Sequence, residues 1–301
     1  MFSLYEIWQV WCNIFFAQEN ATSLGLSRIV MGITLLLKCQ MLWNKIDWYF
    51  GPNGFYPYYS WKGFGHGQSK LYFSLFHYLY PSLASAYVVF LGLVISSFCL
   101  TIGWHSSLSA LVALLCWTSM CHRNIYTFNS GDSLIRLLLA MLVFSGCGSA
   151  LSLDNYLLDK SQIYNTVDPW MIRIMQITCL SVYLQSFYWK MNSGDDWRSG
   201  WGLYYSMNNK AYNKWIVTKS WSPIVAMTFN YMMLATQPLC GLGLWFKETN
   251  QISLVVLIFM HVCFEFMMRI AYFSGAMICA IVLFIDPKML AEFLHNYCYL
   301  R

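Results

Sequence analysis

Long apolar segments separated by short polar loops rich in aromatic residues dominate this chain. A helix needs about 20 apolar residues to cross a bilayer, and most of these segments approach that length. The last one is long enough for two short spans, or for one span and a re-entrant helix. The segments are Leu24–Trp43, Ser82–Gly103, Ser106–Cys121, Ser133–Leu151, Ile174–Trp189, Pro223–Phe246 and Ile252–Ile285. The pattern predicts an all-α fold, a polytopic transmembrane bundle of about seven to nine membrane helices.

The first twenty residues have a different pattern, in which aromatic side chains recur at near-helical spacing. Such a segment is typical of an amphipathic helix lying at the membrane surface. We therefore expect an interfacial helix over residues 1–20 and a single transmembrane domain over residues 21–301.

Composition supports a multi-pass membrane protein. Only 10% of the 301 residues are charged and 58% are apolar, whereas soluble domains carry about 25% charged residues. The net charge of +5 is spread along the loops, which favours contact with anionic lipid and argues against a nucleic-acid partner. The eleven cysteines include no CxxC and no Cys/His pair with zinc spacing, so no metal site is predicted.

A polar stripe runs along the central apolar segment. Gln176, Tyr183 and Lys190 are seven residues apart in turn, so on a helix they share one face. Polar stripes in membrane helices usually face other helices or a wet cavity. Two interpretations of Lys190 stay open: an interfacial lysine that reaches the headgroups, or an amine that points into the bundle.

Other charged residues lie within or beside the apolar segments. His261, Glu265 and Arg269 follow one another at helical spacing, which predicts a Glu265–Arg269 ion pair or a protonated acid. His261 and Glu265 could also be two metal ligands, although no further ligands are marked. The sequence also predicts an Asp132–Arg136 pair one turn apart.

Two basic residues lie in the first apolar segment. Both Arg28 and Lys38 could reach the headgroups, and Arg28 could instead point into the bundle. No G-x-S-x-G, P-loop, dinucleotide-binding or HExxH motif occurs. The residues alone leave open a membrane enzyme with a lipid-soluble cofactor and a transporter or assembly subunit.

Six ordered pieces of the sequence resemble the horizontally transferred transmembrane (HTTM) family, which includes bacterial relatives of the vitamin K-dependent gamma-carboxylase. The pieces are SRIVMGITLLL at 27–37, FGPNGFYP at 50–57, HRNIYTFNSGDSLIRLLL at 122–139, SLD at 152–154, the Q…Y…K…W…G segment within 171–207, and His261 with the following MMRIAYFSGAMICAIVLF. In length and architecture the chain is similar to sporulation-delaying protein B, which helps to mature a secreted toxin peptide.

This resemblance implies a chemistry and a site. In the carboxylase, a lysine takes a proton from vitamin K hydroquinone, oxygen adds, and the strong base that results deprotonates a peptide. Lys190 matches that lysine, and it could act as a base if burial under Trp189 and Tyr188 lowered its pKa. Tyr183, Gln176, His261 and Trp189 become candidate cofactor-binding residues. The residues expected to support the bundle or its pocket are Arg28, Arg123, Asn124, Asp132, Arg136, Glu265 and Arg269.

The resemblance therefore implies a quinol-dependent, carboxylase-like or oxidoreductase enzyme in a bacterial cytoplasmic membrane. Its cofactors would be a reduced quinone (menaquinol or vitamin K hydroquinone) and oxygen, and its substrate a secreted peptide that it modifies or helps to cleave. The carboxylase has two adjacent lysines where this chain has Trp189 and Lys190. The 301 residues also contain no segment that resembles the large C-terminal region with which the carboxylase docks a propeptide. Substrate recognition is thus expected from a partner protein. The alternative is a non-catalytic export, immunity or assembly subunit.

Overall fold

The computed structural model describes residues 3–63, 72–158, 166–214 and 221–298. Within these ranges the chain is almost entirely helical, so the predicted all-α bundle is confirmed. The strands β1 (Glu19–Asn20) and β2 (Thr166–Val167) form one small antiparallel pair.

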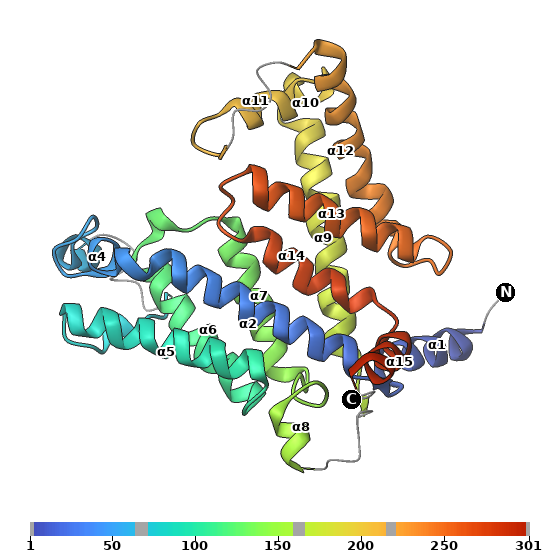
Figure 1. Cartoon of the computed structure of the whole chain (residues 1–301), viewed down its shortest axis with the longest axis horizontal. Helices are drawn as coiled ribbons and strands as arrows, with labels where there is room; N and C mark the ends of the chain where they lie inside the picture. Colours follow the sequence, from blue (N-terminus) through green and yellow to red (C-terminus); the bar gives the residue numbers. More distant parts are fainter. Residues whose placement is uncertain (1–2, 64–71, 159–165, 215–220, 299–301) are drawn as a thin grey trace.

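Four helices form the main body of the bundle. They are α2 (Thr22–Leu42), α5 (Leu83–Ile102), α6 (Ser106–Arg123) and α7 (Ser130–Phe144). The helix α14 (Phe273–Ile281) packs on α2, as Figure 1 shows. Gly32 permits the close approach of α2 and α5, because a Cβ there would lie 2.8 Å from the backbone nitrogen of Thr101.

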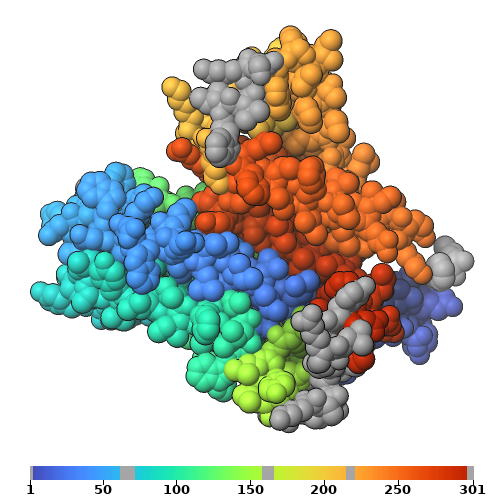
Figure 2. Space-filling view, in the orientation of Figure 1, coloured from blue at the N-terminus to red at the C-terminus, as the bar shows by residue number. Residues whose placement is uncertain are grey.

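A second group of helices extends from this body. It consists of α9 (Trp170–Asn192), α12 (Pro223–Gly243) and α13 (Asn250–Met267), with the short α10 (Asp195–Arg198) and α11 (Gly202–Asn208) beside the end of α9. In Figure 2 the yellow and orange segments of this group project above the wider blue and green body. The structure thus places the C-terminal end of α9 in the projection and its N-terminal end in the body.

Shorter elements occupy the edges of the molecule. They are α1 (Leu4–Phe16), α3 (Ile46–Phe50), α4 (Tyr58–Gly63), α8 (Leu153–Leu158), α15 (Pro287–Cys298) and the 3-10 turns η1 (Trp43–Lys45), η3 (Leu75–His77), η4 (Ile125–Thr127) and η6 (Val282–Phe284). A capping box at Ser3 and Glu6 starts α1, which has no buried residue. Helix formation over residues 4–16 agrees with the interfacial helix expected there, whose position in a membrane stays a prediction.

Three described stretches are long and apolar enough to cross a membrane: Thr22–Phe50, Leu83–Ile102 and Asn250–Met267. The count of seven to nine membrane helices therefore stays a prediction. The last apolar segment divides into α13 and α14, in agreement with a two-part segment. The helix expected to reach Leu151 ends at Phe144, where turns containing Gly146, at a φ of 69°, follow it.

Candidate functional site

The predicted polar stripe on α9 is present. Gln176 and Tyr183 are buried, and Lys190 is half-buried near the end of the helix. Each of the three contacts a different part of the molecule, so they mark three positions along one helix face.

Lys190 has neutral neighbours. Its Nζ donates a hydrogen bond to Ser186 Oγ at 2.7 Å and lies 5.3 Å from the centre of the Trp197 ring. Among the described residues, no carboxylate forms an ion pair with this amine. A ring face attracts a cation only modestly when compared with a carboxylate. Lys190 is therefore removed from much of the solvent without a described counter-charge.

The side chain that covers Lys190 differs from the one expected. Tyr188 and Trp189 are exposed, at 59% and 58%, because their positions on α9 face away from the neighbouring helices. Trp197, on α10, covers the amine instead. The expectation that Trp189 and Tyr188 bury the lysine is therefore wrong, and no described contact places Trp189 in the pocket.

Trp197 is held by Gly202 and Asn230. A Cβ at Gly202 would lie 2.3 Å from the Trp197 ring, so only glycine permits this packing. Asn230, fully buried on α12, donates to the backbone oxygen of Trp197 at 3.0 Å and accepts from Leu203 N at 3.0 Å. Sequence reasoning missed both Trp197 and Asn230. The glycine- and tryptophan-rich stretch after Lys190 was the available signal.

Tyr183 and His261, both predicted from the sequence, are brought together. The Tyr183 hydroxyl lies 2.8 Å from His261 Nε2, and the two side chains are 3% and 2% exposed. His261 Nδ1 is buried and has no hydrogen-bond partner among the described residues. The rings of Phe264 and Phe273 lie 6.2 Å and 6.0 Å from the imidazole.

The unpartnered imidazole nitrogen can act as a hydrogen-bond donor. If the Tyr183 hydroxyl donates to Nε2, the proton of the neutral imidazole is on Nδ1, which is then a free donor among aromatic side chains. A quinone or quinol oxygen could accept that hydrogen bond. The buried Nδ1 without a described partner is the observation on which a cofactor role for His261 would depend, and that role stays a prediction.

Gln176 connects two elements of the protein through its side-chain amide. Its Nε2 donates to the backbone oxygen of Leu283 at 2.8 Å, and its Oε1 accepts from Arg173 Nη1 at 3.0 Å. Both ends of the amide are therefore used by the protein, linking α9 to η6. The expected role of Gln176 in binding a cofactor stays a prediction.

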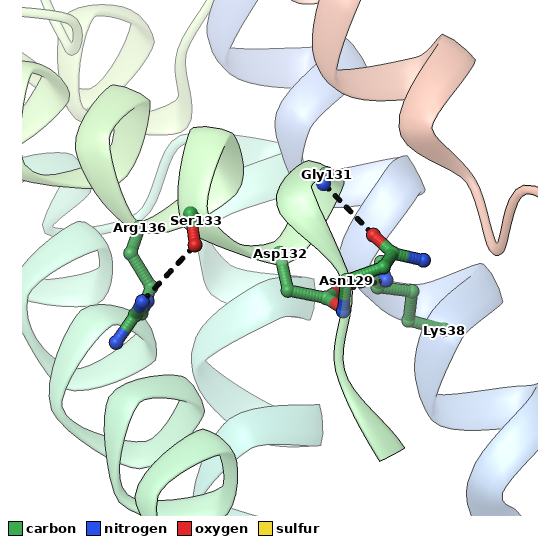
Figure 3. A network of polar contacts seen from close by, with 6 residues as sticks. All are labelled: Lys38, Asn129, Gly131, Asp132, Ser133 and Arg136. Atoms are coloured by element: carbon green, nitrogen blue, oxygen red, sulfur yellow. Dashed lines mark hydrogen bonds and ion pairs between the residues drawn. The ribbon is translucent and has the colours of Figure 1, made fainter. Parts of the chain in front are cut away.

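The most deeply buried ion pair among the described residues was not predicted. Lys38 on α2 pairs with Asp132 at the start of α7, and these residues are 1% and 3% exposed. Figure 3 shows Lys38 beside Asn129 and Asp132 at the start of α7, with Arg136 pointing to the opposite side of this helix.

The predicted Asp132–Arg136 ion pair is wrong. The Asp132 carboxylate instead accepts the Asn129 N–H and so caps the start of α7. Arg136 instead lies 2.9 Å from His122 Nε2.

Lys38 does not have the headgroup-reaching position that the sequence suggested for it. Its amine is in the bundle, 5.0 Å from the centre of the Trp117 ring, and does not reach a headgroup region. The prediction of a headgroup-reaching lysine is wrong because the carboxylate of Asp132 provides a counter-charge inside the fold.

Arg28 points into the bundle, which decides between its two interpretations. It is fully buried and donates to the backbone oxygens of Cys147, Leu100, Thr101 and Leu151. These carbonyls follow α7 or end α5, so the guanidinium satisfies acceptors that helix ends leave without partners. Arg28 therefore connects three parts of the body.

Arg123 and Asn124 hold the first loop. Arg123 donates to the backbone oxygens of Tyr56 at 2.8 Å and Gly51 at 3.0 Å, and Asn124 Nδ2 donates to that of Tyr49 at 2.8 Å. Both side chains are fully buried. Their positions agree with the supporting role expected for them.

Comparison with known protein families shows which family this chain belongs to. The sequence matches the HTTM domain over residues 16–288. The chain belongs to the HTTM domain family. This domain is associated with membrane proteins that resemble the vitamin K-dependent carboxylase. No curated protein and no solved structure matched the chain.

Within this HTTM domain, the predicted Glu265–Arg269 pair is wrong. The helix α13 ends at Met267, so Arg269 leaves the helical face and its N–H donates to the backbone oxygen of Tyr212 at 2.6 Å. Glu265 Oε1 lies 3.9 Å from Lys214 Nζ. The loop after α11 thus folds onto the end of α13 and supplies the basic partner.

Metal binding is not supported by a cluster of ligands. Among the residues that the structure describes, no group of three or more His, Cys, Asp or Glu side chains gathers as a metal site would require. His261 contacts Tyr183, while Glu265 contacts Lys214. The two residues that the sequence left open as metal ligands therefore have separate neighbours.

Proposed function

We propose that this HTTM protein is a membrane enzyme that uses a reduced quinone and oxygen to modify or help cleave a secreted peptide. It would act in a bacterial cytoplasmic membrane, with a partner protein that supplies substrate recognition. The association of the domain with carboxylase-like membrane proteins supports this proposal. The observation that carries it is the Lys190 amine, which has only neutral described neighbours.

A lysine acts as a base only when it is neutral. Removing an ammonium from water without a counter-charge disfavours its charged form, whereas a paired lysine remains charged. In this proposal Lys190 accepts a proton at Nζ, and the hydroxyl of Ser186 orients the amine. Trp197 shields the site from water, because its ring lies over the same nitrogen.

Tyr183 and His261 are the residues proposed to hold the cofactor. When bound, a reduced quinone together with oxygen would supply the strong base that the peptide reaction needs. The hydrogen bond from Tyr183 fixes the imidazole orientation, and Nδ1 provides a donor for an oxygen of the cofactor. Their burial keeps this donor away from competing water.

The test is maturation of the peptide by cells that carry Lys190→Met or Lys190→Arg. Methionine keeps the length of the side chain without an amine, and arginine keeps a charge that proteins do not remove. We expect both variants to insert in the membrane and to lose maturation. Lys210→Met, at an exposed lysine beyond α11, is the matched control and should keep it.

The cofactor has its own readout. Mass spectrometry of the lipid extract from purified protein should detect a co-purified quinone, reduced in amount by His261→Leu and unchanged by Lys210→Met. Full maturation with both Lys190 variants would exclude the enzyme proposal and leave a non-catalytic export, immunity or assembly subunit.

A further inference from the structure

A second polar stripe lies on α12, the helix that packs beside α9. Asn230 and Gln237 are seven residues apart and Gly241 is one turn further along, so the three share one helix face. Both polar side chains are buried, at 0% exposure for Asn230 and 5% for Gln237. Figure 1 shows α12 beside α9 in the projection, with α13 crossing the two. Each polar atom on this face therefore requires a hydrogen-bond partner.

The stripe is held against α9 at both ends. At one end, Asn230 donates to the backbone oxygen of Trp197 at 3.0 Å. At the other end, a Cβ on Gly241 would lie 3.3 Å from the Cβ of Tyr183. Gln237 is on the same face between these two contacts. It therefore lies between the ring that covers the proposed base and the tyrosine of the proposed cofactor pair.

The side-chain amide of Gln237 lies where α12 meets α13. Its Nε2 donates to Met233 Sδ at 3.2 Å. Met233 and Phe264 of α13 pack in one apolar cluster, and the Phe264 ring lies 6.2 Å from the His261 ring. The neighbours of Gln237 thus lead to His261 by two routes, through Met233 and Phe264 and through Tyr183.

The oxygen of this amide has no described partner. Gln237 Oε1 is buried and accepts no hydrogen bond from the residues that the structure describes. The orientation of the amide follows from its bond to Met233, because a thioether sulfur accepts from an N–H group and has no hydrogen to give to an oxygen. Leaving a buried acceptor unpaired is costly. A hydrogen-bond donor is therefore expected beside Oε1.

His261 Nδ1 is the complementary group. The one described partner of the Tyr183 hydroxyl is His261 Nε2, so the hydroxyl donates there and the imidazole proton is on Nδ1. This N–H is buried without a described acceptor, as Gln237 Oε1 is without a donor. An oxygen that carries a hydrogen satisfies both, since it accepts from Nδ1 and donates to Oε1. A carbonyl oxygen satisfies only the imidazole.

We propose that Gln237 is a specificity-determining residue that selects the reduced form of the quinone. A hydroxyl of the quinol donates to Gln237 Oε1 and accepts from His261 Nδ1, whereas a carbonyl of the oxidised quinone makes only the second bond. A site built to bond a hydroxyl discriminates against an analogue that lacks it. This inference rests on the proposed function for the class of ligand, and it adds the group that distinguishes the two redox states.

The test is isothermal titration calorimetry of the full chain, purified in detergent and kept free of oxygen, with menadione or with its reduced form, menadiol. We expect the protein to bind menadiol about tenfold more tightly, the usual contribution of one hydrogen bond between neutral groups. Gln237→Leu should lower the affinity for menadiol about tenfold and leave the affinity for menadione unchanged. Gln237→Met, which keeps the length of the side chain, should do the same.

Gln185→Leu is the matched control. This glutamine is on α9, within the same group of helices, but its side chain is exposed. The control should bind both forms as the parent does. Thermal unfolding of ligand-free Gln237→Leu should match or exceed that of the parent, because a leucine of similar size removes an unpaired acceptor. Loss of menadiol affinity in this variant then reports on the amide oxygen.

The proposal is overturned if the parent binds menadione and menadiol equally, or if Gln237→Leu keeps the preference for menadiol. The second result is expected if a buried water alone occupies the position between Gln237 and His261. Lys190→Met should keep the preference, so binding and peptide maturation are separate readouts. Equal binding of the two forms, with maturation that still depends on Lys190, overturns this inference alone. Full maturation with both Lys190 variants, with the menadiol preference intact, overturns the proposed function alone.

Discussion

Lys38 and Lys190 make an instructive comparison. Each lies near the end of a long helix, and each amine lies close to a tryptophan ring, at 5.0 Å from Trp117 and 5.3 Å from Trp197. Lys38 is 1% exposed and pairs with Asp132, whereas Lys190 is half-buried and bonds to a serine hydroxyl. The difference is the counter-charge. A lysine paired with a buried carboxylate holds helices together, whereas Lys190 has no described counter-charge, which is the feature that the proposed function uses.

Removing the amine of Lys38 should have the largest effect on stability. Lys38→Met leaves the Asp132 carboxylate buried and unpaired, which should cost about 3–5 kcal/mol of unfolding free energy. Thermal or denaturant unfolding of the purified protein in detergent would measure this loss.

The double variant Lys38→Met with Asp132→Leu is the control for charge. It removes both members of the pair and should recover more than half of the stability that Lys38→Met loses. It also removes the helix cap made by Asp132, which costs about 1 kcal/mol and keeps the recovery from being complete. If the double variant is as unstable as Lys38→Met, packing and not the unpaired charge dominates at this position.

The buried Tyr183–His261 contact should have an intermediate effect. Tyr183→Phe leaves both imidazole nitrogens without a described partner and should destabilise the fold by about 1–3 kcal/mol. Tyr80→Phe, at a tyrosine that is 81% exposed, should change stability by less than about 0.5 kcal/mol. Equal effects of the two substitutions would show that the buried hydrogen bond contributes nothing of its own.

Lys190 should show the smallest effect on stability and thus sharpen the comparison. Lys190→Met removes one hydroxyl contact and one cation–ring contact, worth together about 1 kcal/mol or less. Unfolding experiments under the conditions used for Lys38→Met would measure it. A loss as large as that of Lys38→Met would mean that Lys190 has a structural role.

Local reasoning placed residues on the correct helix face but did not identify the partners of the charged ones. The stripe of Gln176, Tyr183 and Lys190 follows from helix periodicity alone. The pairs expected at one-turn spacing were wrong, because Asp132 pairs with a residue 94 positions away and Glu265 lies beside Lys214, 51 positions away. Sequence spacing gives the neighbours on a helix but not the charge that packing brings from elsewhere.

The end of a helix was equally hard to predict. The apolar pattern continues past Met267, but α13 ends at this residue. The loop after α11 forms backbone hydrogen bonds there, from Lys214 N–H to the Met267 oxygen and from Arg269 N–H to the Tyr212 oxygen. The pairing of Tyr183 with His261 likewise depends on how α9 and α13 pack. Both residues could be nominated from the sequence, but their contact could not.

Hydrophobic composition and periodicity by themselves determined that this chain is a helical membrane protein with a polar face on α9, because each helix must bury or expose its own side chains according to their spacing. Only the tertiary structure decided which charges are compensated, since a counter-charge such as Asp132 or a covering ring such as Trp197 comes from a separate element. That is why two lysines that both lie near the end of an apolar segment have different environments in the fold.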